Sequence, residues 1–150
     1  MPALEAEATK PRTTSKRSSG VYLTDPLDAH ILVVDDDAVL RDMVVAALEL
    51  RGATLSTAGS LAEAAAQPGP FDLVLVDLCL GDERGDAVIA HLREMGVADR
   101  ALMMSGTELP NTLSERGRPD GVLRKPFELD ALFEAVAATL QAADESSAAG

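Results

Sequence analysis

The stretch ILVVDDDAVLR, residues 31–41, joins four consecutive aliphatic residues to three consecutive aspartates. A short aliphatic run that contains β-branched residues is typical of a strand buried on both faces, as in a parallel sheet. The aspartates then lie at the carboxyl end of that strand, which in an open parallel sheet is the edge where ligands bind. The stretch therefore predicts a buried strand with a functional site at its end.

Further aliphatic runs follow along the chain, separated by segments of helical period. The runs are ATLST at 53–57, LVLV at 73–76, ALMM at 101–104 and GVLR at 121–124. In the helical segments apolar residues recur at intervals of three and four, most clearly from Leu129 to Leu140. Strands that alternate with helices predict βαβ units. The expected fold is α/β, a doubly wound parallel sheet of five strands.

The weakest helical segment lies between the last two runs. Residues 109–119, LPNTLSERGRP, offer only Leu109 and Leu113 as spaced apolar anchors, and Gly117 interrupts them. A glycine inside a helix is less favourable than alanine by about 1 kcal/mol. We therefore expect the fourth helix to be degenerate.

Composition changes at both ends of the chain. Residues 1–28 have no apolar period that could bury a face and are expected to form a disordered N-terminal tail. Residues 142–150 are expected to form a flexible C-terminal tail. One domain, residues 29–141, lies between them and is long enough to fold unaided.

Charge and cysteine content restrict the partners and the location. The chain has 13 basic and 25 acidic residues, a formal net charge of −12. Because nucleic-acid binding depends on Lys and Arg side chains that neutralise phosphates, this charge argues against a nucleic-acid partner. No apolar run approaches the roughly 18 residues of a membrane span, so no membrane contact is expected. Cys79 is the only cysteine, which favours a cytoplasmic location.

Polar side chains of complementary chemistry follow four of the predicted strands. In chain order they are Asp35, Asp36, Asp37, Asp77, Ser105 and Lys125. Neighbouring carboxylates repel one another, and Mg²⁺ removes this conflict because it binds carboxylate oxygens. Phosphoryl transfer needs an oxygen nucleophile, a metal, and a cation or hydroxyl for the phosphoryl oxygens. Groups of all these types are predicted at one edge of the sheet.

Each of these residues also has a purely structural interpretation. An aspartate after a strand, such as Asp37, is a common N-cap of the next helix. Asp77 fits a turn, Ser105 fits a cap, and Lys125 fits a strand exit. Their joint placement at the ends of four different strands favours the functional interpretation.

Four motifs resemble, in order and spacing, those of the receiver domains of response regulators, the family typified by the chemotaxis response regulator of motile bacteria. The motifs are ILVVDDDAVLR, FDLVLVDLCLGDERG, LMMSG and LRKPF, within about His30 to Leu140. The resemblance implies a flavodoxin-like sheet with strand order 2-1-3-4-5. It also implies a single-domain signalling protein that is not an enzyme, apart from slow self-phosphorylation and self-dephosphorylation. Its phosphoryl donor would be a partner histidine kinase or phosphotransfer protein.

Carried over residue by residue, the resemblance implies a phosphoacceptor and two groups that bind the phosphoryl oxygens. Asp77 would accept the phosphoryl group, Ser105 would donate a hydrogen bond to it, and Lys125 would pair with its charge. The Lys125–Pro126 peptide bond would be cis, as is usual in this family.

The same resemblance implies a Mg²⁺ site. Asp35 and Asp36 would form the acidic metal pair, with Asp36 as a direct ligand. Asp77 and the backbone carbonyl of Cys79 would complete the protein ligands.

Some positions depart from the family pattern. Gly81 replaces a usual proline, which should loosen the loop after Asp77. Val122 replaces the aromatic residue that swings inward in many receivers, so output through the face of the fourth helix, fifth strand and fifth helix is expected to be atypical. Cys79 and Thr107 flank the route of the attacking water without positioning it, which predicts slow self-dephosphorylation. The Cys79 thiol is expected to pack rather than to sense redox state.

Two alternative functions fit parts of the sequence. Asp35 to Val39 also resembles the first motif of haloacid-dehalogenase-like phosphatases, with Asp35 as nucleophile and Asp37 as general acid. That reading leaves Asp77 unused and lacks the acidic motif expected after the lysine. The other alternative is an interaction module that keeps the fold and signals without phosphorylation.

Overall fold

The computed structural model describes the backbone of residues 26–149 and the side chains of residues 26–141. Five parallel strands form the central sheet in the order β3-β2-β4-β7-β8. They are β2 (His30–Val34), β3 (Thr54–Ala58), β4 (Leu73–Asp77), β7 (Ala101–Ser105) and β8 (Gly121–Arg124). Numbered along the chain within the sheet, the order is 2-1-3-4-5, which confirms the expected doubly wound α/β fold.

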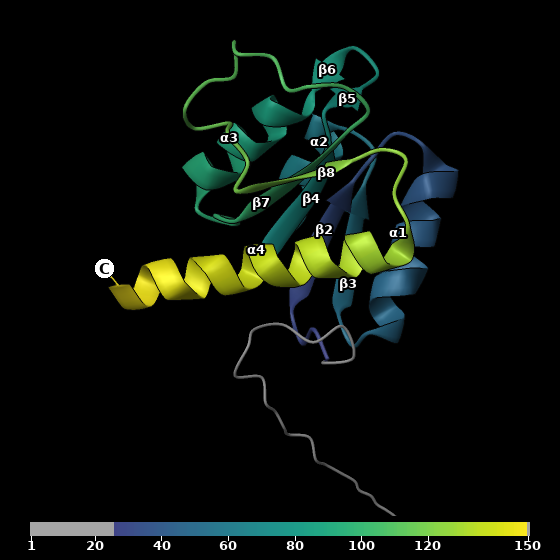
Figure 1. The fold of residues 1–150 in the computed structure, drawn as a ribbon. Coiled ribbons are helices and arrows are strands. Elements are labelled where there is room, and N and C mark those ends of the chain that lie inside the picture. The colour runs from purple at the N-terminus through teal and green to yellow at the C-terminus, as the bar shows by residue number, and fades with distance from the viewer. Residues whose placement is uncertain (1–25, 150) are drawn as a thin grey trace, which may run out of the picture.

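Helices cover both faces of the sheet (Figure 1). They are α1 (Ala38–Leu50), α2 (Leu61–Ala65), α3 (Gly85–Met95) and α4 (Leu129–Ala149). Successive strand residues point to opposite faces. Ile31 accordingly packs in the cluster that contains Val44 of α1 and Leu132 of α4, whereas Leu32 packs in the cluster that contains Ile89 of α3. The core is therefore two aliphatic layers, one on each side of the sheet.

The connection from β7 to β8 contains no helix. Residues 106–120 form turns and bends, and among them only Leu113 and Gly117 are buried. One buried large side chain cannot anchor an amphipathic helix face, since such a face needs apolar residues on successive turns. The expected degenerate fourth helix is confirmed, and the name α4 accordingly belongs to the helix that follows β8.

The described residues near the two ends of the predicted domain are partly ordered by contacts and by a helix. Residues 1–25 of the predicted N-terminal tail lie outside the described residues. Leu27 does not behave as a tail, because its N–H donates to the carbonyl of Arg51 at 2.8 Å and its side chain packs against the α1/α4 cluster. At the other end α4 continues through the predicted tail to Ala149, in keeping with an alanine-rich segment that has neither Gly nor Pro. No helix within residues 26–149 is both long and apolar enough to cross a bilayer.

Candidate functional site

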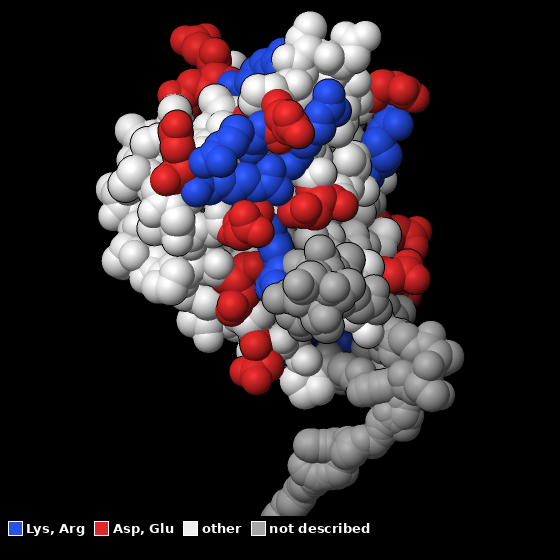
Figure 2. Space-filling view, turned by 90° about the vertical axis from the view of Figure 1, so that its left-hand side faces the viewer, with Lys and Arg blue, Asp and Glu red and all other residues white. Residues whose placement is uncertain are grey.

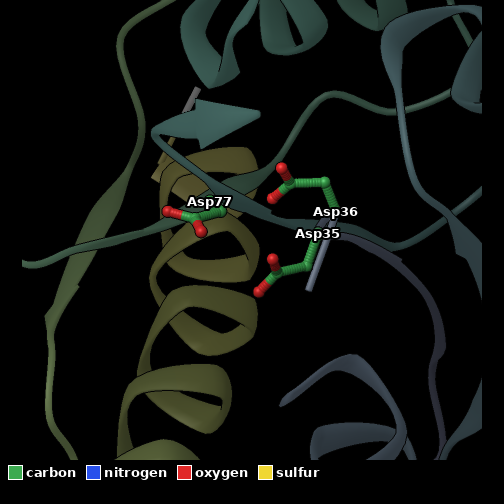
Figure 3. A group of neighbouring side chains, drawn as sticks. All are labelled: Asp35, Asp36 and Asp77. Carbon is green, nitrogen blue, oxygen red and sulfur yellow. The ribbon is translucent and has the colours of Figure 1, made fainter. Parts of the chain in front are cut away.

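Three carboxylates meet at the carboxyl edge of the sheet. Asp35 follows β2, Asp36 is its neighbour, and Asp77 ends β4, the strand that pairs with β2 in parallel. One oxygen from each carboxylate lies within 4.8 Å of the others. Figure 3 shows the carboxyl groups of Asp35 and Asp36 pointing toward the side on which Asp77 lies. The sequence prediction that residues some forty positions apart converge at one site is thus confirmed.

Asp35 is the most constrained of the three. Its side chain is fully buried, its Oδ1 accepts a hydrogen bond from the Asp37 N–H at 2.9 Å, and its Oδ2 has no hydrogen-bond partner within residues 26–141. The pKa of Asp35 is raised to about 6, chiefly by burial; the charges of Asp77 and Asp36 also raise it, whereas the Asp37 N–H and Lys125 lower it. The folded protein therefore holds a carboxylate whose charge is incompletely compensated.

The donor set fits Mg²⁺. Every donor in the cluster is a carboxylate oxygen, the ligand type this ion prefers. The orphaned Oδ2 of Asp35 is a buried acceptor that a cation would satisfy. Asp36 is exposed, so the site opens to solvent, as suits an ion that keeps several of its waters. Asp35, Asp36 and Asp77 would hold the ion.

Asp77 forms an ion pair with the predicted lysine. Lys125 Nζ lies 2.8 Å from Asp77 Oδ2, and the Cys79 N–H donates to Asp77 Oδ1 at 3.3 Å. Partial burial opposes the charge of Lys125, but its hydrogen bond to Asp77 and the surrounding carboxylates outweigh burial and raise the pKa of Lys125. Lys125 is therefore held as a cation against the predicted phosphoacceptor. The Lys125–Pro126 peptide bond is cis, as expected.

Ser105 lies at the end of β7, next to β4, and is buried. Its hydroxyl donates to the Thr107 carbonyl at 2.6 Å and accepts from the Thr107 N–H at 3.1 Å. Both contacts stay within its own loop. The predicted contact between Ser105 and a phosphoryl group on Asp77 would therefore require its hydroxyl to leave the Thr107 carbonyl.

The expectation that the Cys79 thiol packs in the interior is wrong. Cys79 is exposed in β5 (Cys79–Leu80), which pairs with β6 (Glu83–Arg84) in a hairpin that the sequence analysis missed. Neighbouring strand residues point in opposite directions, and Leu80 takes the buried position with 4% exposure. Gly81, in the turn, has a φ of +61°, which proline cannot adopt.

Gly85 is a site residue that the sequence analysis also missed. It is the first residue of α3, and its N–H donates to the Leu78 carbonyl at 2.7 Å. A Cβ at this position would lie 2.3 Å from the backbone oxygen of Asp77. The absence of a side chain thus allows α3 to begin directly against the backbone of the predicted phosphoacceptor. Its signal in the sequence was a glycine shortly after a strand-end aspartate.

Asp37 has the structural role. Its Oδ1 accepts hydrogen bonds from the N–H groups of Val39 and Leu40 at 3.1 and 3.2 Å, so it is the N-cap of α1. A carboxylate engaged in this way is poorly placed to act as the general acid of a phosphatase.

An apolar hollow adjoins the acidic site. It encloses about 470 Å³ and is lined by Asp37, Leu40, Met43, Lys125, Pro126 and Phe127. Leu40 and Met43 belong to α1, and two apolar side chains of this helix are exposed, Val39 at 81% and Met43 at 40%. Exposed apolar surface beside a polar site is typical of a protein-binding region.

Comparison with known proteins identifies the family of this chain. The family model of the response regulator receiver domain matches residues 31–137. The transcriptional regulatory protein TcrA of Mycobacterium tuberculosis is 35% identical over 108 residues, which cover 69% of this chain and 43% of that protein. The response regulator protein PmrA of Pseudomonas aeruginosa is 32% identical over 107 residues, 69% of this chain and 48% of that protein. The chain thus spans about half the length of these curated relatives.

Solved structures show the same fold. The chemotaxis response regulator CheY4 of Vibrio cholerae superposes with a TM-score of 0.65 at 25% identity, covering 74% of this chain and 98% of that one. A receiver domain protein of Methanospirillum hungatei gives a TM-score of 0.66 at 23% identity, covering 78% and 97% of the two chains.

Proposed function

Because the chain belongs to the family of response regulator receiver domains, which act in two-component signalling, we propose that Asp77 is its phosphoacceptor and that a histidine kinase or phosphotransfer protein is its donor. The observation that carries this proposal is the ion pair between Asp77 and Lys125 beside the carboxylates of Asp35 and Asp36. The phosphatase alternative is wrong, since the family match makes this chain a receiver and the structure makes Asp37 a helix cap.

The geometry supports a direct transfer of the phosphoryl group. An oxygen of Asp77 attacks phosphorus, a P–O bond forms, the P–N bond to the donor histidine breaks, and the imidazole leaves with the electron pair. Bound Mg²⁺ would offset the negative charge that accumulates on the phosphoryl oxygens. Lys125, already 2.8 Å from Asp77, supplies a second positive charge from the protein itself.

The transfer also changes the contacts of the site. A phosphoryl group adds about two negative charges, which compete with Asp77 for Lys125 and with the Thr107 carbonyl for the Ser105 hydroxyl. Both residues belong to the segments on either side of residues 106–120, so the new contacts pull on β7 and on the end of β8. The output is a shift between two conformations.

The donor protein binds at the apolar hollow beside the acidic site. This region combines the exposed side chains of Val39 and Met43 with direct access to Lys125. The signal leaves through contact with a downstream protein. We propose no nucleic-acid contact for this domain, because its acidic charge would repel phosphates.

Incubation with Mg²⁺ and acetyl phosphate tests the phosphoacceptor. We expect wild-type protein to gain the mass of one phosphoryl group, and Asp77→Asn to gain none, because its amide cannot act as the nucleophile. Intact-mass spectrometry measures the adduct, and Asp99→Asn is the control, since Asp99 is exposed and its side chain is remote from the acidic cluster. An adduct on Asp77→Asn would refute the assignment, and its absence from the wild type would favour a phosphorylation-independent module.

The lifetime of the adduct is a second expectation at this site. Cys79 and Thr107 place no carboxylate or amide beside Asp77 to orient a water molecule. We therefore expect self-dephosphorylation to be slow, so that the wild-type adduct outlasts removal of the donor. Loss of the added mass within seconds would contradict this.

A further inference from the structure

Basic residues are unevenly distributed in this acidic chain. Residues 26–83 contain eleven acidic side chains and only two basic ones, Arg41 and Arg51. Residues 84–125 contain seven basic side chains against six acidic ones. Figure 2 shows the side of the molecule that carries α3 and residues 106–120, where Lys and Arg side chains adjoin one another. One side of the domain thus differs in charge from the rest.

Arg93 of α3 fixes the backbone of the helix-free segment on this side. Its guanidinium donates to the carbonyls of Arg116 and Arg118 at 2.8 and 2.6 Å, and to Asp120 Oδ2 at 3.0 Å. The Arg93 side chain is 15% exposed, and the Asp120 side chain is 45% exposed. A Cβ on Gly117 would lie 2.6 Å from the Asp86 carbonyl, which shows how closely the segment approaches α3. Arg116 and Arg118 therefore extend from an anchored backbone.

The arginines presented in this way have no partners of their own. Arg116, Arg118 and Arg124 are exposed, and their guanidinium groups form no hydrogen bond or ion pair with any side chain described in residues 26–141. Asp120, an acid of the same segment, is already engaged by Arg93 and by the Ala101 N–H at 2.8 Å.

An exposed apolar side chain, that of Val122, lies on the same strand as Arg124. Val122 and Arg124 of the edge strand β8 pair with Met103 and Ser105, so they face the side of the sheet that α2 and α3 cover. Residues 106–120 form no helix that could cover this part of β8, and Val122 is 43% exposed. We define Arg116, Arg118, Val122 and Arg124 as the arginine surface.

We infer that the arginine surface binds an acidic segment of a downstream protein, which places carboxylates on the arginines and an apolar side chain on Val122. Arginine guanidinium groups bind carboxylates in a bidentate manner, and an anchored backbone reduces the entropy lost on binding. A short acidic peptide is favoured over DNA, because the repulsion from the acidic side chains of the rest of the domain is screened beyond about 8 Å. A long DNA duplex would extend over those acidic side chains and be repelled by them. The inference that the arginine surface transmits the signal depends on the proposed function of the domain.

Fluorescence anisotropy with a dye-labelled peptide of alternating glutamate and valine tests the surface. We expect wild-type protein to bind the peptide, with an affinity that falls as salt is added. The double variant Arg116→Glu/Arg118→Glu should bind at least about tenfold more weakly, because like charges then face each other. Lys10→Glu/Lys16→Glu is the matched control, since it changes net charge equally at positions outside the described residues. We expect it to bind as the wild type does.

Several results would overturn the inference. These are no binding by the wild type, equal binding by the arginine double variant, loss of binding in the lysine control, or tighter binding of a labelled DNA duplex than of the peptide. Denaturation curves should be unchanged in the double variant, because the replaced side chains have no partners. Phosphorylation by acetyl phosphate is measured on the same samples. Intact phosphorylation without peptide binding rejects this surface alone, whereas peptide binding without phosphorylation rejects the phosphoacceptor alone.

Discussion

Replacing Asp35 with asparagine is expected to stabilise the metal-free protein by about 2–3 kcal/mol at pH 8 while abolishing its stabilisation by Mg²⁺. Burial raises the pKa of Asp35 from 3.8 to about 6, so the folded state binds its proton more tightly than the unfolded state does. Ionisation of this carboxyl therefore destabilises the fold. Asparagine removes the charge and keeps an oxygen that can accept the Asp37 N–H, the bond that Oδ1 now accepts at 2.9 Å.

The sign of the pH dependence follows from the same shift. As pH rises from about 4 to about 6, wild-type Asp35 loses its proton first in the unfolded chain, so the free energy of unfolding falls through this window and then levels. Asp35→Asn should lack this contribution. The difference between the two proteins should consequently be small at pH 4 and largest above pH 6.

Urea denaturation across this pH range, with and without Mg²⁺, measures both effects. Mg²⁺ should raise the stability of the wild type by mass action, because the folded state assembles the site, and should leave Asp35→Asn unchanged. Asp99→Asn serves as the control, since it removes an exposed carboxylate outside the acidic cluster. Two results would contradict this prediction: Asp35→Asn being less stable than the wild type at pH 8, or Mg²⁺ stabilising the variant as much as it stabilises the wild type. Either result would mean that the charge of Asp35 does not prepare the site for a cation.

Replacing Gly85 with alanine is expected to destabilise the protein by about 2–4 kcal/mol. The added Cβ would lie 2.3 Å from the backbone oxygen of Asp77, a fixed atom, so α3 or the end of β4 must move. Alanine is the better helix former by about 1 kcal/mol, but this gain is smaller than the cost of the clash. Since the displaced atom belongs to Asp77, phosphorylation by acetyl phosphate should slow as well.

Gly106→Ala is the matched control for Gly85→Ala. A Cβ on Gly106 would meet no atom within 4 Å, and Gly106 also lies near the site, directly after Ser105. Urea denaturation should show little change for Gly106→Ala and the full loss for Gly85→Ala. Equal stability of the two variants would mean that α3 tolerates a side chain at its start, and that its approach to Asp77 is not a fixed feature of the site.

The candidate site was predictable to the extent that it depends on strand ends. Asp35, Asp77 and Ser105 end or follow aliphatic runs, and in a parallel sheet all such ends lie on one edge. Their convergence at one site could therefore be predicted without knowing any side-chain contact. The role of Asp37 was open between ligand and helix cap, because one residue type serves both purposes, and the structure assigns it to the cap.

The sequence alone determined the five strands of the central sheet and the helices between them, because a buried strand and an amphipathic helix each leave a short-range period of apolar residues that the chain carries locally. Tertiary structure alone decided three other features: the exposure of Cys79 in a hairpin, the start of α3 against the Asp77 carbonyl, and the anchoring of residues 116–120 by Arg93. Each is a contact between segments whose approach is set by how the whole chain packs. No local pattern in the residues specifies such an approach.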